Sequence, residues 1–217
     1  MATFIFDLDG TLANTIPIIR RVAKITSEQY GIPTSDEDID RYIGVPLIVT
    51  GEEVLGKGRC EEYTLAYAKN YQAHKSELQA FPGIVEMIKK LDKEGAKLAI
   101  ATSKREKPAH ETLELIGVAP YFQVVLNSES GCGYKPAAGP ALKAMELLGS
   151  RPEESWFIGD SLHDMACGQA AGIGTIGVTW GIIPPGGFDI IKPTYICDQV
   201  SELSDLLLRL QHQYLSV

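Results

Sequence analysis

The sequence has few basic residues, few cysteines and little sign of a membrane or export segment. Its 217 residues include 20 Lys and Arg against 28 Asp and Glu, so the net charge is −8. Because nucleic acid and anionic membranes are bound by basic faces, neither partner is expected. The cysteines form no Cys-x-x-Cys pair that would indicate a zinc site or a redox dithiol, and they fit a reducing cytoplasm: Cys60, Cys132, Cys167 and Cys197.

Long apolar stretches are also lacking. At the N-terminus no basic region precedes an apolar run, and Asp7 interrupts the first run at once, so no secretory signal is expected. The longest uncharged run, residues 165–188, contains seven glycines and two prolines. Such a run breaks into short elements and predicts buried sheet and loop instead of a membrane span. We therefore expect a cytoplasmic protein, as a monomer or a homodimer.

Short apolar runs alternate with helix-length amphipathic segments along most of the chain. The runs resemble buried parallel strands: 3–6, 97–101, 122–126, 155–158 and 173–178. The segments between them have apolar residues three and four positions apart, typical of crossover helices: 84–94, 107–116, 137–148 and 163–171. This alternation predicts an α/β fold with a doubly wound, mainly parallel, Rossmann-like sheet, which binds ligands at the carboxyl ends of its strands.

One interval, residues 14–80, breaks the alternation because it contains helical stretches and no convincing strand. Ser35, followed by three acidic residues, is typical of a capped helix start, and Phe81-Pro82-Gly83 is typical of a hinge back to the sheet. We predict a core of residues 1–13 and 81–217 with an all-helical cap at 14–80. The cap carries 8 basic and 10 acidic residues, which favours a substrate lid over a nucleic-acid arm.

Acidic side chains follow two of the predicted strands. Asp7 and Asp9 come after the first strand, and Asp160 and Asp164 after the fourth. Parallel strands end at one sheet edge, so these carboxylates should gather there and repel one another unless a cation intervenes. Mg²⁺ prefers oxygen ligands and leaves positions for substrate phosphate, so we expect a magnesium site and phosphate chemistry.

The motifs resemble those of the haloacid dehalogenase-like hydrolases, in particular the phosphatases with a small helical cap such as phosphoglycolate phosphatases. The resemblance covers nearly the whole chain, and its motifs occur in order: Asp7-Leu8-Asp9-Gly10-Thr11-Leu12, Thr102 after the second strand, Lys135-Pro136, and Gly159-Asp160-Ser161-Leu162-His163-Asp164. It implies a Mg²⁺-dependent phosphatase that acts on a small phosphorylated metabolite.

The resemblance also implies the role of each site residue. Asp7 would attack phosphorus and form an aspartyl-phosphate, and Asp9 would protonate the leaving alcohol and then activate water. Thr102 would bind a phosphoryl oxygen, and Lys135 would offset negative charge. Magnesium would be held by Asp7, by Asp160 and by the backbone carbonyl of Asp9, while Asp164 would be either a ligand or an outer-sphere group.

Two of these positions have structural alternatives. Ser103 is a candidate phosphate ligand beside Thr102, but Ser103-x-x-Glu106 also matches a helix capping box, and we predict capping for Ser103. Lys135-Pro136-Ala137-Ala138-Gly139-Pro140 departs from the usual Lys-Pro-x-Pro by two inserted positions. The insertion bears on how the next helix begins, and the lysine itself is retained.

Several other functions remain open. Asp9 and the acidic cluster argue against a dehalogenase, and Thr11 is typical of phosphatases instead of sugar-phosphate mutases. A sugar-phosphate mutase or a pyrophosphatase of the same fold, and a non-catalytic phosphate-ligand or protein-binding module, stay as alternatives. Residues 51–58 approach a P-loop without its final Ser or Thr, and residues 172–177 match GxGxxG in the wrong structural context, so nucleotide chemistry is disfavoured.

The cap should choose the substrate. A carboxylate-bearing substrate such as phosphoglycolate would need a cap cation, and Arg41 is the candidate we select among five: Arg20, Arg21, Arg41, Lys57 and Arg59. Each of these is also compatible with an ordinary solvated position, because exposure is the usual state of Lys and Arg.

Overall fold

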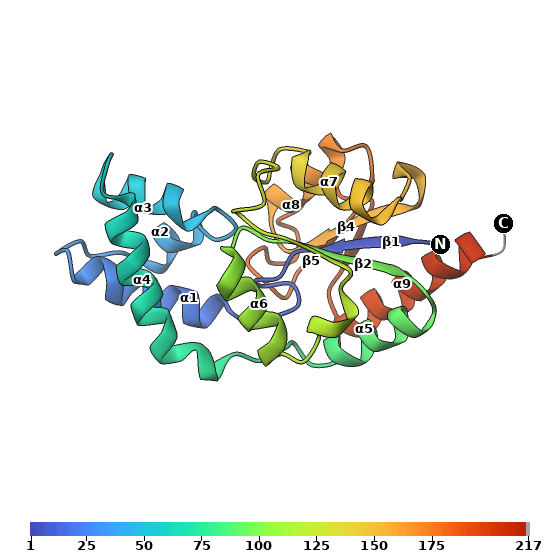
Figure 1. Ribbon diagram of the computed structural model, residues 1–217, viewed down its shortest axis with the longest axis horizontal. Coiled ribbons are helices and arrows are strands. Elements are labelled where there is room, and N and C mark those ends of the chain that lie inside the picture. The colour runs from blue at the N-terminus through green and yellow to red at the C-terminus, as the bar shows by residue number, and fades with distance from the viewer. Residues whose placement is uncertain (216–217) are drawn as a thin grey trace.

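The computed structural model describes residues 1–215, which form one six-stranded sheet with helices on both faces and a group of helices beyond one edge (Figure 1). All strand pairs are parallel, in the order β3-β2-β1-β4-β5-β6. The strands are β1 (Thr3–Phe6), β2 (Lys97–Ala101), β3 (Val124–Leu126), β4 (Ser155–Gly159), β5 (Gly174–Val178) and β6 (Tyr195–Cys197). The predicted doubly wound α/β sheet is confirmed.

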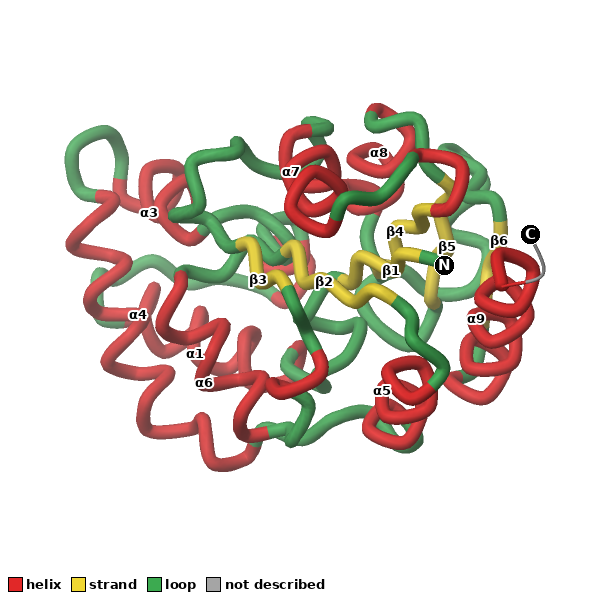
Figure 2. Tube along the Cα trace, turned by 45° about the vertical axis from the view of Figure 1, so that its right-hand side comes forward, coloured by secondary structure: helices red, strands yellow, loops and turns green. Residues whose placement is uncertain are grey.

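Alternate residues of the strands supply two apolar cores, one on each face of the sheet. Phe4 and Phe6 point into a core with α5 (Ile84–Lys93), α6 (Glu106–Leu115) and α9 (Val200–Leu215). Ile5 points into the opposite core with α7 (Gly139–Leu148) and α8 (Leu162–Ala170). Figure 2 shows α7 and α8 on one side of the sheet and α5 and α9 on the other. Two covered faces explain why the strands consist of continuous apolar runs.

The observed core differs from the predicted one in small ways. Strand β6 was not predicted, because it is a short edge strand in which Cys197 alone is buried. Helix α7 begins at Gly139, not at residue 137. Pro140 has no amide hydrogen to donate and fits the first turn, while a Cβ at Gly139 would overlap the carbonyl of Cys132. Gly172 follows α8 with a φ of 71°, as expected of the glycine that ends a helix.

Four helices and one short 3₁₀ helix lie between β1 and α5: α1 (Ile16–Glu28), α2 (Asp36–Asp40), α3 (Leu47–Leu55), α4 (Cys60–His74) and η1 (Lys75–Glu77). Figure 1 shows these inserted helices beyond the carboxyl ends of the strands, opposite the N-terminus. Ser35 caps α2 with the reciprocal bonds that its sequence predicts. The two connections to the sheet lie side by side, since the Phe81 amide donates to the carbonyl of Leu12 at 3.1 Å.

The remaining short helices are η2 (Ala119–Tyr121) and η3 (Pro152–Glu154), both in connections at the sheet. Among the described residues, no helix combines the length and the apolar character needed to cross a membrane.

Candidate functional site

Three buried carboxylates meet at the carboxyl ends of the central strands of the sheet. Asp7 follows β1, Asp160 follows β4, and Asp164 lies in the first turn of α8. One oxygen from each lies within 4.8 Å of the others. Strands β1 and β4 are hydrogen-bonded neighbours, so the residue that follows each strand lies close to the other, as the sequence predicts.

Lys135 lies among these carboxylates. Its Nζ is 2.7 Å from Oδ1 of Asp7 and 2.6 Å from Oδ1 of Asp164, and only 2% of its side chain is exposed. The second oxygen of Asp164 accepts hydrogen bonds from the amide and the hydroxyl of Ser161. Both carboxylate oxygens of Asp164 are therefore engaged, one with Lys135 and the other with Ser161 at the start of α8.

The charges of the cluster are not balanced by the protein. Burial raises the pKa of Asp7 from 3.8 to about 7, a rise that Lys135 opposes and the neighbouring carboxylates reinforce. Burial likewise raises the pKa of Asp160 well above its ordinary value, and Asp7 and Asp164 raise it further. Burial by itself would lower the pKa of Lys135, but its two carboxylate partners raise it above the ordinary value.

This donor set fits a hard divalent cation. Three carboxylates face one lysine, which leaves two formal negative charges in a buried place. The donors are all oxygens, as Mg²⁺ requires, and a bound cation would favour the ionised carboxylates, whose pKa values are raised by burial and by one another. Asp9, which the sequence also suggests for the metal site, has its carboxylate outside this group of three.

The loop after β5 holds Asp160 in place. The Ile182 amide donates to Oδ2 of Asp160 at 2.8 Å, and the Thr11 hydroxyl donates to Oδ1 at 3.2 Å. A Cβ at Gly181 would overlap Oδ2 of Asp160 and lie 2.5 Å from the Gly10 carbonyl. Glycine is thus needed at position 181 for this close approach.

Asp9 lies two residues beyond Asp7 and is paired with a lysine that sequence reasoning did not identify. Nζ of Lys104 is 2.6 Å from Oδ1 of Asp9 and lies 5.0 Å from the centre of the Tyr71 ring. Burial opposes the charge on Lys104, but Asp9 and the nearby tyrosines raise its pKa above the ordinary value. Lys104 lies three residues after the end of β2, and this position is the feature of the sequence that could have identified it.

Thr102 and Ser103 follow β2 but have different surroundings. Thr102 is buried, and its hydroxyl accepts a hydrogen bond from the Lys104 amide at 3.2 Å. The predicted helix cap at Ser103 is wrong, because α6 begins at Glu106, whose amide bonds the carboxylate of Glu129. The Ser103 hydroxyl instead donates to the carbonyl of Gly44, between α2 and α3, at 2.5 Å.

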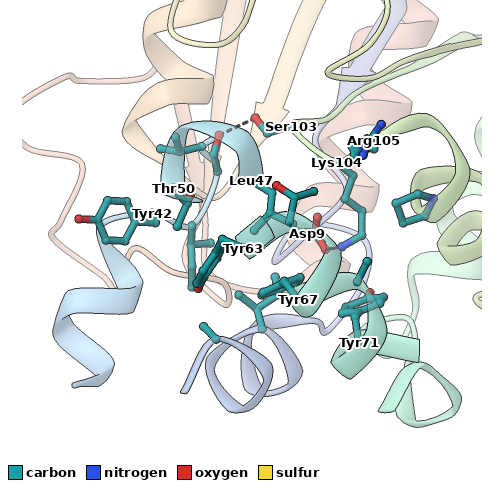
Figure 3. A pocket seen from close by; sticks show the side chains of 18 of the residues that line it. Asp9, Tyr42, Leu47, Thr50, Tyr63, Tyr67, Tyr71, Ser103, Lys104 and Arg105 are labelled. Atoms are coloured by element: carbon teal, nitrogen blue, oxygen red, sulfur yellow. Dashed lines mark hydrogen bonds and ion pairs between the residues drawn. The ribbon is translucent and has the colours of Figure 1, made fainter. Parts of the chain in front are cut away.

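A cavity of about 460 Å³ separates the sheet edge from the inserted helices (Figure 3). One side of its wall comes from the loops after β1, β2 and β3 and from the start of α6: Asp7, Asp9, Thr102, Ser103, Lys104, Arg105, Lys107, Pro108 and Glu129. The inserted helices and their loops contribute mainly apolar and aromatic side chains, among them Ile39, Tyr42, Ile43, Leu47, Val54, Tyr63, Leu65, Tyr67 and Tyr71. The two aspartates of the first motif thus face an apolar chamber.

The five basic residues that the sequence suggests for substrate binding do not line this cavity. Arg41, the candidate for substrate binding, has 73% of its side chain exposed and lies 3.5 Å from Asp38. Three of the other four pair with acidic residues on the surface: Arg20 with Asp40, Arg21 with Glu77 and Arg59 with Glu62. The structure does not bring these cations to the acidic cluster.

Comparison with known proteins agrees with the fold and the motifs. The model of the haloacid dehalogenase-like hydrolase family matches residues 4–178, and the chain belongs to that family. It is 32% identical over 210 residues to pyrophosphatase PpaX of Bacillus mycoides, a match that covers 96% of this chain and 97% of the relative. The family resemblance seen in the sequence is confirmed.

Solved structures show the same fold. A haloacid dehalogenase-like family hydrolase from Streptococcus pneumoniae is similar with a TM-score of 0.83 and 25% identity, over 95% of this chain and 98% of that one. A predicted phosphoglycolate phosphatase from Haemophilus somnus has a TM-score of 0.82 over 95% and 98% of the two chains. At 22% identity the second similarity shows the fold alone.

Proposed function

We propose that this hydrolase is a Mg²⁺-dependent phosphatase that transfers a phosphoryl group to Asp7 and then to water. The observation that carries the proposal is the position of Asp7, buried against Lys135 within the three-carboxylate cluster and lining the cavity that also contains Asp9. Such a carboxylate is placed to act as a nucleophile toward a substrate that enters the cavity.

In the first step a carboxylate oxygen of Asp7 forms a bond to phosphorus while the bond from phosphorus to the leaving oxygen breaks. Asp9 gives a proton to the leaving alkoxide, which departs as an alcohol. In the second step Asp9 takes a proton from water as the water oxygen attacks phosphorus. The phosphorus–oxygen bond to Asp7 breaks, phosphate is released, and the free Asp7 carboxylate is regenerated.

Other residues of the site position and stabilise the reacting groups. Lys135 offsets charge on Asp7 and on the phosphoryl oxygens, and the Thr102 hydroxyl binds one of those oxygens. Asp164 is a positioning residue, because its oxygens hold Lys135 and Ser161. Magnesium, held by Asp7, Asp160 and the backbone carbonyl of Asp9, would supply positive charge to the phosphoryl group.

We further propose that residues 14–80 act as a cap over a core of residues 1–13 and 81–217. The cap would exclude water from the cavity during phosphoryl transfer and contact the leaving group. The contact of Ser103 with Gly44 supports a closed arrangement in which core and inserted helices meet at the cavity.

Two substrates deserve priority in the test. The Bacillus mycoides relative bears the name pyrophosphatase, and the sequence motifs resemble those of phosphoglycolate phosphatases. Both compounds therefore belong in the test of the proposal, together with sugar phosphates and nucleoside monophosphates.

The test is phosphate release from this panel with and without Mg²⁺, by wild-type protein and by Asp7→Asn. The proposal expects Mg²⁺-dependent release from at least one compound and its loss in Asp7→Asn. Asp189→Asn, a change of an exposed aspartate outside the cluster, is the matched control and should retain the wild-type rate. Equal release by wild type and Asp7→Asn would contradict the assignment of the nucleophile.

A further inference from the structure

Two of the three cations in the described cavity wall are closely paired with acidic residues of the same wall. Lys104 pairs with Asp9 at 2.6 Å, and Arg105 pairs with Glu129 at 2.7 Å. Lys107 lies 4.0 Å from Glu111 and has 83% of its side chain exposed. The inserted helices contribute no Lys or Arg to the described cavity wall. A carboxylate or a second phosphate on the leaving group would therefore find no buried, uncommitted cation in the described wall, because the one loosely paired cation, Lys107, is largely exposed to solvent.

Three tyrosine side chains line the cavity from α4. Tyr63, Tyr67 and Tyr71 follow one another at four-residue spacing on α4, so their side chains lie along one face of the helix (Figure 3). The ring centres are 6.3 Å apart between Tyr63 and Tyr67, and 6.1 Å apart between Tyr67 and Tyr71. The planes of the second pair are only 18° apart.

The wall also has one polar group without a partner. The Tyr71 hydroxyl is buried and makes no hydrogen bond within the described chain. The Leu65 side chain lines the cavity at an exposed position, so the apolar wall extends to the protein surface.

We propose that the site acts preferentially on phosphomonoesters of uncharged, ring-bearing alcohols, whose ring would lie along the tyrosines of α4. This inference rests on the proposed phosphatase function and specifies its substrate class. A cavity of about 460 Å³ has room for a ring beyond the phosphoryl group. Its apolar wall gains from covering such a ring, whereas a charged leaving group would lose its hydration without gaining a buried counter-ion.

The first test compares kcat/KM in Mg²⁺ for benzyl phosphate, ethyl phosphate and phosphoglycolate. All three release a primary alcohol, so their intrinsic reactivities are similar. Differences in kcat/KM therefore measure how well the cavity accommodates the leaving group. We expect benzyl phosphate to exceed the other two by about tenfold or more, since even one methylene in an apolar pocket changes kcat/KM by roughly 10- to 200-fold. A value for phosphoglycolate equal to or above that for benzyl phosphate would overturn the inference.

The second test adds a cation to the cavity rim. Leu65 has 68% of its surface exposed, so Leu65→Lys should fold normally. It should lower the ratio of kcat/KM for benzyl phosphate to that for phosphoglycolate by about fivefold or more, because the new charge attracts the carboxylate. Leu115→Lys, at a 49% exposed position of α6 outside the cavity, should leave the ratio unchanged. An unchanged ratio in Leu65→Lys would overturn the inference.

Pyrophosphate separates the inference from the function on which it rests. Mg²⁺-dependent release from pyrophosphate, lost in Asp7→Asn, with no release from benzyl phosphate would overturn the substrate class and leave the phosphatase function intact. Absence of release from every compound by the wild type would overturn both.

Discussion

Nζ of Lys104 lies 2.6 Å from Oδ1 of Asp9, and only about a tenth of either side chain is exposed. Lys104 also lies against the ring of Tyr71 on α4, so one lysine contacts both the proposed acid/base and the inserted helices. Asp9 is thereby held in a fixed orientation at the cavity, which an unpaired carboxylate on a turn would not be. Lys104 is a positioning residue in this account, because it acts through Asp9.

Lys104→Met should lower kcat by about tenfold or more, because general acid/base catalysis contributes roughly 10²- to 10⁴-fold and depends on the orientation of the catalytic group. Lys104→Arg should recover part of the loss, since it restores a charged partner for Asp9. The measurement is steady-state phosphate release in saturating Mg²⁺.

The matched control for Lys104 is Lys107→Met. Lys107 lines the same cavity but is largely exposed and lies 4.0 Å from its nearest acidic partner, so its loss should leave kcat unchanged. Equal kcat in Lys104→Met and wild type, with both folded, would show that the lysine does not position Asp9.

The raised pKa of Asp7 predicts a pH-dependent stability of the metal-free protein. The native state keeps the Asp7 proton up to about pH 7, whereas the unfolded chain loses it near 3.8. The native state thus binds more protons between these values, and its stability falls as the pH rises through this window. Asp7→Asn cannot ionise and escapes this loss, which amounts to about 1.4 kcal/mol per pKa unit.

Urea unfolding in EDTA measures this effect. The free energy of unfolding of Asp7→Asn minus that of the wild type should increase between pH 5 and pH 8, by roughly 1–3 kcal/mol. The difference removes contributions from the many surface carboxylates, which titrate alike in both proteins. A difference that stays constant over this range would contradict the raised pKa.

Magnesium should stabilise the protein through Asp160. A cation bound to the native state alone stabilises it by about 2.7 kcal/mol at a concentration 100 times Kd, and Tm should rise accordingly. The rise should be larger at pH 8 than at pH 5, because protons compete for the carboxylates. Asp160→Asn should abolish the rise, whereas Asp189→Asn should retain it. A full Mg²⁺ shift in Asp160→Asn would place the cation elsewhere.

Gly181→Ala should lower activity without changing a group that contacts the substrate. Its new methyl group would overlap the Asp160 carboxylate, and such displacements of catalytic groups cost roughly 10- to 100-fold in rate. The change should also weaken the Mg²⁺-induced rise in Tm. Ile190→Ala, at an exposed position of the same loop, should alter neither quantity. Wild-type kcat in Gly181→Ala would show that the close packing on Asp160 is dispensable.

The sheet and the acidic cluster could be predicted because they depend on local patterns and on one rule of topology. Apolar runs marked five of the six strands, and parallel strands end at one edge, which places Asp7 beside Asp160. The sixth strand was missed because Tyr195 and Ile196 are exposed and make no buried run. The sequence pattern reports burial, so a short exposed edge strand leaves little signal.

Contacts between distant segments could not be predicted in the same way. Ser103 and Glu106 match a capping box locally, but Glu129, 23 residues from Glu106, bonds the Glu106 amide instead. The pair of Lys104 with Asp9 spans 95 residues and depends on how the loops after β1 and β2 meet. Arg41 was selected for its charge and its place in the cap, whereas the fold leaves it paired with Asp38 on the surface.

Transfer of the phosphoryl group to Asp7 can be tested by trapping the intermediate. The protein is mixed with substrate and Mg²⁺, quenched in acid within one turnover and treated with borohydride, which reduces an acyl phosphate to the alcohol. Mass spectrometry of the tryptic peptide Met1–Arg20 should then locate the reduced side chain at residue 7, and Asp7→Asn should yield none. Reduction at another aspartate, or phosphate release by Asp7→Asn at the wild-type rate, would contradict phosphoryl transfer to Asp7.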